Sequence, residues 1–304
     1  MFGANEAVLA YIRRLVGAKT DRLDINGSLH SKIRGTMLSG VFFLNDGYDG
    51  LATWTTNTTL ESGIYRLSSA TVNSGVTLTP TGSFLGLFIQ GTLTINGTLS
   101  ASGKGAAGGS GANATNNAGH LPGYNGVDGF GPCGSGGGAG GTTLARGGGG
   151  GSTDVFGSNG GLNNPGTTGN NCTKGGRFAS DLRDILSFCG AGGGGGAGYS
   201  GSSSYSGKGG SGGAGGGCIF IVADTIIGTG AIRADGLSGG TANNGTSLSA
   251  AGGGGGGGGG CIFLFAKTIS IPMLTVAGGA AGAMDTAGNP GAAGGNGSVI
   301  KIPL

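Results

Sequence analysis

The chain contains few charged and few metal-binding residues. Only 10% of its 304 residues are charged, and the net charge is +3. Glutamate occurs twice, at Glu6 and Glu61, and histidine occurs twice, at His30 and His120. An active site needs clustered titratable groups, and a nucleic-acid interface needs a basic patch, whereas the basic residues here are scattered. We therefore expect no enzymatic activity, no metal, no cofactor and no nucleic-acid partner.

Carboxylate pairs suited to glycoside hydrolysis are scarce as well. Asp224 and Asp235 flank one repeat unit and form the only suggestive pair. Both positions also suit turns, where aspartate is favoured, and we expect the turn role. Asp181 and Asp184 are expected on the exposed side of a short helix. No GxSxG elbow and no GxxxxGK[ST] phosphate loop occurs in the chain.

Long apolar runs are absent too. None approaches the ~20 residues that a membrane-spanning helix needs, so no membrane insertion is expected. The start, MFGANEAVLAYIRRL, lacks the apolar core and small-residue cleavage site of a signal peptide. We expect synthesis in the cytoplasm of the cell that makes the protein.

The five cysteines include no CxxC pair. Cys218 and Cys261 each open a strand of the repeat described below, and we expect them to be small buried apolar residues. A disulfide among Cys133, Cys172 and Cys189 is left open, because composition alone supports it.

Glycine, in contrast, is abundant, with 80 residues, most of them after residue 102. The glycines have no strict three-residue period along the chain, and proline is scarce, which argues against a collagen triple helix. Low charge and positive mean hydropathy argue against disorder. The runs Gly147–Gly151, Gly192–Gly196 and Gly252–Gly260 predict packed polyglycine-II helices, with flexible linkers as the alternative.

A repeat connects the glycine runs. The segments 87–103, 218–236 and 261–279 each contain an apolar strand, a break, a second strand and a short third strand, and SVIKIPL (298–304) repeats the first strand. This pattern predicts parallel strand ladders, with glycine-rich excursions that return the chain to the next turn. From Ser68 the residues alternate with period two, as in a β-helix or small sandwich. The predicted inward residues are Val72, Val76, Leu78, Leu87, Ile89, Leu93, Ile95 and Leu99.

Two segments have helical patterns. Residues 4–34 contain a heptad seam with apolar ends, formed by Val8, Ile12, Leu15, Leu29 and Ile33. It predicts an attachment and oligomerisation element, with two short helices, or a helix packed on its own domain, as alternatives. Residues 177–190 (RFASDLRDILSFCG) place Phe178, Leu182, Ile185 and Leu186 on one face of a short helix.

The loops between the glycine runs are rich in Tyr, Ser, Gly and Asn, which are typical of recognition loops. We expect receptor binding there, while scattered aromatic residues in ordinary turns are the alternative. The candidate receptor-binding residues are His120, Tyr124, Phe130, Phe156, Tyr199 and Tyr205.

Long glycine runs, polar-aromatic loops and short apolar strands together resemble the glycine-rich adhesins at the tail-fibre tips of some T-even-type phages. In those proteins packed polyglycine helices form a rigid sandwich whose loops bind the host. The resemblance covers roughly residues 104–304. The strand-containing repeat is more similar to a wider set of glycine-rich phage virion proteins.

The segment 16–35 resembles N-terminal segments of siphophage tail and other virion proteins, through Gly27, Ser28, Leu29, His30, Lys32 and Ile33. The resemblance implies that the N-terminus docks on other virion proteins.

The expected protein is mainly β, with packed polyglycine-II helices. It has an N-terminal helical attachment region (1–45), a β-rich, β-helix-like neck (46–103) and a glycine-rich β-ladder and polyglycine domain (104–304). The expected function is that of a tail-associated phage adhesin, a homo-oligomer and most plausibly a trimer, that is assembled into the virion and recognises a host polysaccharide or outer-surface protein. The alternatives are a capsid decoration or head spike, a polysaccharide depolymerase and a silk-like surface-matrix protein.

Overall fold

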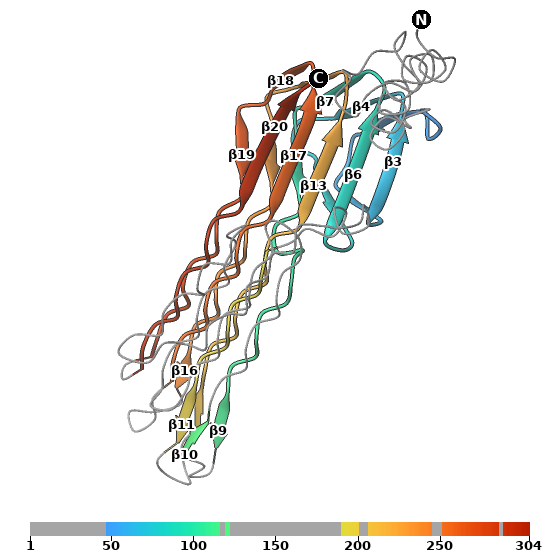
Figure 1. Ribbon diagram of the computed structural model, residues 1–304. Coiled ribbons are helices and arrows are strands. Elements are labelled where there is room, and N and C mark those ends of the chain that lie inside the picture. The colour runs from blue at the N-terminus through green and yellow to red at the C-terminus, as the bar shows by residue number, and fades with distance from the viewer. Residues whose placement is uncertain (1–46, 116–118, 122–189, 201–205, 245–250, 286–287) are drawn as a thin grey trace, which may run out of the picture.

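The computed structural model describes residues 47–115, 119–121, 190–200, 206–244, 251–285 and 288–304. These residues form a region of three parallel β-sheets, and a bundle of glycine-rich segments that extends from it (Figure 1). The described part of the chain is mainly β and contains no helix. The two helices expected at 4–34 and 177–190 lie outside the described residues.

Each of the three sheets contains five parallel strands. The first sheet consists of β1 (Leu51–Trp54), β4 (Ser69–Val72), β7 (Thr92–Ile95), β14 (Thr225–Ile227) and β18 (Thr268–Ser270). The second consists of β2 (Thr58–Leu60), β5 (Thr77–Pro80), β8 (Thr98–Ser100), β15 (Ala231–Arg233) and β19 (Met273–Thr275). The third consists of β3 (Gly63–Leu67), β6 (Phe84–Ile89), β13 (Cys218–Val222), β17 (Cys261–Ala266) and β20 (Ser298–Pro303). The chain visits the three sheets in this order and repeats the circuit five times.

The register of the strands confirms the repeat predicted from the sequence. Cys218 lies opposite Cys261, and Cys261 lies opposite Ser298. The first repeat unit, however, begins at Phe84 and not at Leu87 as predicted, because Phe84 lies opposite Cys218 in the strand register. Apolar residues stacked at equal positions bury their side chains together, which favours this register over a slipped one.

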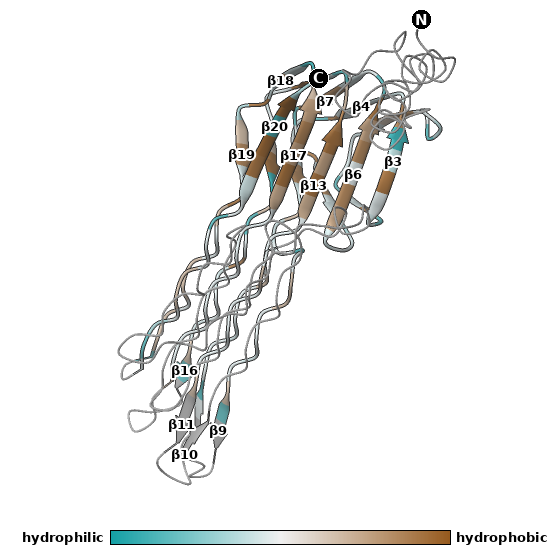
Figure 2. Ribbon diagram, viewed as in Figure 1, coloured by the Kyte–Doolittle hydropathy of each residue, from teal (hydrophilic) through white to brown (hydrophobic). Residues whose placement is uncertain are grey.

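The interior between the sheets is a continuous apolar core. All eight residues predicted to point inward belong to it, and each is at most 4% exposed. Figure 2 shows the hydrophobic residues concentrated in the strands, while the glycine-rich segments lie near the middle of the hydropathy scale. The core includes residues from β4 to β8 and from β13 to β17, so segments before and after residue 103 share the same sheets.

Seven described glycine-rich segments, here called rods, run alongside one another below the sheets (Figure 1). They are rod 1 (104–112), rod 2 (190–197), rod 3 (209–217), rod 4 (234–242), rod 5 (251–260), rod 6 (276–283) and rod 7 (288–297). They belong to three excursions of the chain, each of which leaves after a strand of the second sheet and returns at a strand of the third.

Rod 5, which contains nine consecutive glycines, is hydrogen-bonded on all sides. Gly252, Gly253 and Gly254 donate in turn to carbonyl groups of rod 2, rod 7 and rod 4, and the same order repeats at 255–257 and 258–260. Rods 3 and 6 donate to carbonyl groups of rod 5 as well. Every residue from 251 to 260 is buried. Three consecutive residues face three different neighbours. A Cβ would clash with a backbone carbonyl group at Gly253, Gly254, Gly256, Gly257, Gly259 and Gly260.

The outer rods need glycine only on the sides that contact other rods. In rod 7 a Cβ would clash with carbonyl groups of rod 5 at every third position: Gly288, Gly291, Gly294 and Gly297. The positions between them include Asn289, Pro290, Ala292 and Ala293. In rod 7 the three-residue period of glycine therefore marks the side that packs on rod 5, whereas the unbroken runs of rods 2 and 5 are buried throughout.

The cysteines differ from expectation in one respect. Cys218 and Cys261 are fully buried, as predicted for small apolar residues. Cys261, however, is disulfide-bonded, whereas Cys218 remains a thiol. The sequence left a disulfide open only among Cys133, Cys172 and Cys189, because the expected burial of Cys261 in a strand favoured a packing role.

Candidate functional site

The end of the rods far from the three sheets carries short strands (Figure 1). These strands are β9 (Asn113–Thr115), β10 (Gly119–Leu121), β11 (Gly198–Ser200), β12 (Ser206–Lys208) and β16 (Asn243–Asn244). β12 pairs with β9 and β16, and β10 pairs with β11, all antiparallel. This end, here called the distal tip, is therefore a hydrogen-bonded structure in which separate excursions of the chain meet.

Two of the predicted receptor-binding residues lie at the distal tip. His120 of β10 is directly opposite Tyr199 of β11. The structure thus brings together two residues that are far apart in the sequence. The other four candidates, Tyr124, Phe130, Phe156 and Tyr205, lie outside the described residues. So do the attachment residues Val8, Ile12, Leu15, Leu29 and Ile33.

A polar groove of about 530 Å³ lies beside the distal tip. Its lining comes from rods 1, 3 and 4 and from the strands at their ends: Ser110, Gly111, Lys208, Gly209, Gly210, Ser211, Gly240, Thr241 and Asn243. All five of its side chains beyond glycine are exposed. Hydroxyl, amide and ammonium groups at a solvent-facing groove can donate to and accept from sugar hydroxyls, and the ammonium group can pair with a carboxylate.

None of these residues was among the named receptor-binding candidates, although Lys208, Thr241 and Asn243 belong to the loops in which binding was expected. Lys208 and Ser211 are three residues apart on one side of rod 3, and Ala214 continues that side. Ser110 and Thr241 occupy equivalent outward positions on rods 1 and 4, where the neighbouring positions contact other rods. The signal that would have found them is the polar residue at every third position of a glycine-rich segment.

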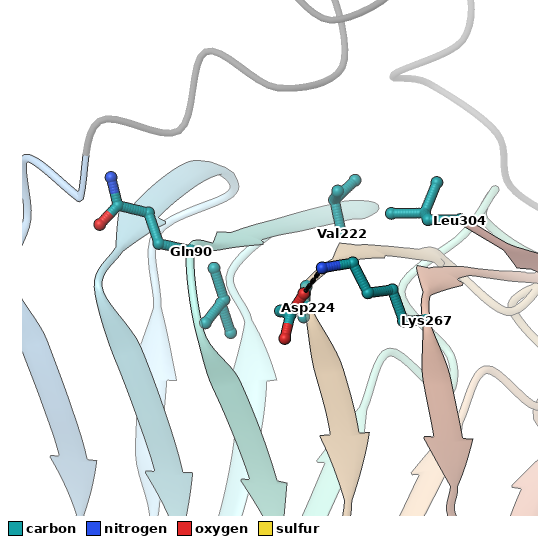
Figure 3. A pocket seen from close by; sticks show the side chains of 7 residues that line it. Gln90, Val222, Asp224, Lys267 and Leu304 are labelled. Atoms are coloured by element: carbon teal, nitrogen blue, oxygen red, sulfur yellow. Dashed lines mark ion pairs between the residues drawn. The ribbon is translucent and has the colours of Figure 1, made fainter.

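A second pocket, of about 420 Å³, lies at the opposite end of the molecule, where β6, β13 and β17 end (Figure 3). Its lining is Ile89, Gln90, Val222, Ala223, Asp224, Lys267 and Leu304. Asp224 and Lys267 form an ion pair across it, with side chains 45% and 68% exposed. The two opposite charges therefore lie side by side at a turn that is open to solvent.

The two aspartates considered as a catalytic pair take part in separate interactions. Asp224 pairs with Lys267 before β14, whereas Asp235 follows β15 and accepts hydrogen bonds from the Thr275 hydroxyl (2.9 Å) and the Ala277 amide (2.8 Å). Asp235 also lies 3.5 Å from the hydroxyl of Ser102. Its carboxylate therefore joins the starts of the three excursions, after β8, β15 and β19.

One tyrosine and two carboxylates interact at the edge of the third sheet. Burial raises the pKa of Tyr65 above its usual value, and Glu61 and Asp49 add to the effect; the Tyr65 hydroxyl donates to the Glu61 carbonyl at the edge of the third sheet. Within the described ranges, no three His, Cys, Asp or Glu side chains gather as a metal site would require. No helix that could span a membrane occurs there either.

Comparison with family models, with curated proteins and with solved structures finds no match to this chain. Its function is therefore inferred from its own residues and their arrangement.

Proposed function

We propose that the chain is a structural protein of a bacteriophage virion, a tail-associated adhesin whose distal tip binds the host cell surface. The observation that carries the proposal is the hydrogen bonding of rod 5 to rods on all sides, which binds the glycine-rich segments into one bundle. The bundle holds a polar tip and groove at a distance from the three sheets. The protein acts by binding and positioning, without catalysis.

The rods are packed polyglycine-II helices in this proposal. Polyglycine II has three residues per turn, a rise of about 3.1 Å per residue, and backbone groups directed outward. The three-residue order of donors along rod 5 supports this assignment, as do the glycines at each point of contact. The nine glycines would then span about 28 Å.

The three-sheet region is a β-helix in the same proposal. Its support is the cyclic order in which the chain visits the three sheets, together with the continuous core between them. In such a fold each turn stacks on the previous one, so an excursion inserted in one turn stays beside the excursion of the next. Stacked turns therefore bring glycine-rich excursions into contact and build the bundle.

The distal tip suits a polar target. The groove presents three hydroxyl groups, one amide and one ammonium group, which match a host surface polysaccharide or a polar face of an outer-surface protein. Residues 1–45 attach the chain to other virion proteins and assemble it as a homo-oligomer, most plausibly a trimer. A stiff bundle of rods between the attachment region and the distal tip keeps the tip accessible after assembly.

Gold-labelled antibodies against the protein, applied to intact virions, test this proposal. We expect label at the tail, away from the head. Label on the head would instead identify a capsid decoration or head spike, and absence of the protein from purified virions would overturn the proposal altogether.

A further inference from the structure

The polar groove beside the distal tip has a floor and two walls, each formed by one rod. The amides of Gly209 and Gly212 in rod 3 donate to carbonyl groups of rod 1. The amides of Leu237 and Gly240 in rod 4 donate to carbonyl groups of rod 3. Rod 3 therefore forms the floor, and the groove lies above it and between its neighbours, rods 1 and 4.

Only one position in each turn of rod 3 has room for a side chain. A Cβ on Gly212 would clash with a carbonyl group of rod 2, and a Cβ on Gly213 would clash with a carbonyl group of rod 4. The remaining position is occupied in successive turns by Lys208, Ser211 and Ala214. Lys208 and Ser211 are exposed and line the groove. In the polyglycine-II geometry proposed above, they are about 9 Å apart along the rod.

The walls place hydroxyl groups beside this floor. Ser110 of rod 1 is followed by Gly111, where a Cβ would clash with rod 3, and by Ala112, whose amide donates to rod 2. Thr241 of rod 4 lies between an amide that donates to rod 3 and an amide that donates to rod 6. Because the adjacent positions are held against other rods, Ser110 and Thr241 are the exposed positions of their turns.

The groove carries positive charge. Lys208 is the charged residue among the described lining residues, and these include no carboxylate. Asp235 of rod 4 precedes Thr241 by six residues, about 19 Å along a polyglycine-II helix, and its carboxylate accepts hydrogen bonds from Thr275 and Ala277. The groove therefore favours a ligand with a negatively charged group.

The chemistry of the lining fits a carbohydrate better than a protein. The described lining residues include no aromatic and no large apolar side chain, whereas protein partners bind chiefly through such anchors. Sugar hydroxyls donate and accept hydrogen bonds, as the serine and threonine hydroxyls of the groove do. Polar groups that follow a straight, rigid rod suit an extended chain that repeats its hydroxyl groups.

We propose that the groove binds an acidic polysaccharide, whose sugars carry carboxylate groups, and that the polysaccharide chain lies along rod 3. This inference rests on the proposed function and names the class of ligand at the same site. Lys208 pairs with a carboxylate through a charge-assisted hydrogen bond. Ser211 on the floor and Ser110 and Thr241 on the walls bond the hydroxyls of the same chain.

An array of matched oligosaccharides tests the class of ligand. It carries oligomers of uronic and sialic acids and, beside each, the carboxyl-reduced form, in which every carboxylate has become a neutral hydroxymethyl group. We expect the full-length protein to bind at least one acidic form fivefold or more above its reduced form, and to lose this preference as added salt screens the charges. Equal binding to both forms of every pair, or no binding to any acidic form, would overturn the proposal.

Lysine variants locate the preference on the protein. Lys208→Gln should reduce binding to the preferred acidic oligosaccharide at least fivefold and leave binding to the reduced form unchanged, because the variant loses the charge but keeps a polar side chain. Lys208→Arg keeps the charge and should retain the preference. Lys301→Gln, an exposed position in the sheet region, is the matched control. A preference that survives in Lys208→Gln would place the ligand elsewhere.

Ser211→Leu tests the course of the polysaccharide along rod 3. Position 211 has room for a side chain, so the melting temperature should stay unchanged, while the larger apolar group obstructs the floor of the groove and reduces binding at least fivefold. Ala293→Leu makes a similar enlargement at an exposed position of rod 7 and should leave binding unchanged. Undiminished binding by Ser211→Leu would contradict the placement along rod 3.

The ligand class and the proposed function fail separately. Gold label at the virion tail, without a preference for acidic oligosaccharides, would leave the adhesin standing and remove the acidic ligand. A preference that depends on Lys208, in a protein absent from virions, would do the reverse. Adsorption that is lost after protease treatment of the host cells, together with no binding on the array, would identify an outer-surface protein as the target instead.

Discussion

A Cβ on Gly256 would lie closer to the carbonyl oxygen of Gly279 than the 3.0 Å that real Cβ atoms keep from their neighbours. On another side, the amide of Gly256 donates a hydrogen bond to the carbonyl of Ala292, at 2.8 Å. Gly256 therefore contacts rod 6 and rod 7 at once, through backbone atoms alone. Close approach of backbones, rather than burial of side chains, holds this part of the molecule together.

Replacing Gly256 by Val should destabilise the protein by more than about 2 kcal/mol, because the backbone of rod 6 cannot move away without breaking its own hydrogen bonds. Thermal unfolding and protease resistance measure the effect. Ala280→Val is the matched control, since Ala280 is an exposed residue of rod 6, and it should change stability by less than about 0.5 kcal/mol. Wild-type stability of Gly256→Val would mean that the glycine run is a linker.

The three-residue period of the outer rods predicts a difference between adjacent glycines. Gly294 faces carbonyl groups of rod 5, where a Cβ has no room. Gly295 is exposed, and Ala292 occupies the equivalent position one period earlier. Gly294→Ala should therefore lower the unfolding free energy by about 1–3 kcal/mol, and Gly295→Ala by far less. Equal effects in the two variants, measured by denaturant unfolding, would contradict the packing of rod 7 on rod 5.

The positions of residues in the three-sheet region could be predicted from the sequence better than the positions of the rods in the bundle. Leu93, Ile95 and Leu99 alternate with small polar residues, and that period places them inward without knowledge of their neighbours. The position of a rod in the bundle, in contrast, depends on which other rods surround it. Gly256 and Gly295 look alike in the sequence, yet one is central and the other exposed.

The distal groove escaped sequence reasoning for the same reason. Ser110, Ser211 and Thr241 are separated by long stretches of chain, and only the hydrogen bonding among rods 1, 3 and 4 brings them together. The pairing of His120 with Tyr199 likewise depends on the alignment of two rods. A loop rich in Tyr, Ser and Asn indicates recognition but does not indicate which loops meet.

Asp235 should matter for stability rather than for catalysis. Asp235→Ala leaves the Thr275 hydroxyl and the Ala277 amide without their acceptor, which should cost about 1–3 kcal/mol. Asp224→Ala breaks only an exposed ion pair with Lys267 and should cost less than about 1 kcal/mol. Calorimetry compares the two variants. Release of reducing sugar from host polysaccharide by the wild type, abolished in Asp224→Ala, would contradict the proposed non-catalytic role.

Lys208 should contribute to binding without contributing to stability. Its side chain is exposed at the groove, and neutralising it removes the ammonium group that the described lining residues supply there. We expect Lys208→Gln to weaken adsorption to host cells about fivefold or more, the effect of losing about 1 kcal/mol, with an unchanged melting temperature. Lys301→Gln, an exposed lysine on β20 in the sheet region, is the matched control. Equal adsorption of both variants would place the binding site elsewhere.

Hydrogen exchange at the nine glycines tests most directly the claim that they form a rigid rod at the centre of a bundle. The amides of residues 252–260 each donate a hydrogen bond to rod 2, 7 or 4, at 2.7–2.9 Å. We predict that these amides exchange as slowly as those of β13 and β17, since only global unfolding exposes them. Exchange at the rate of an unstructured peptide, with the strands still protected, would contradict the account.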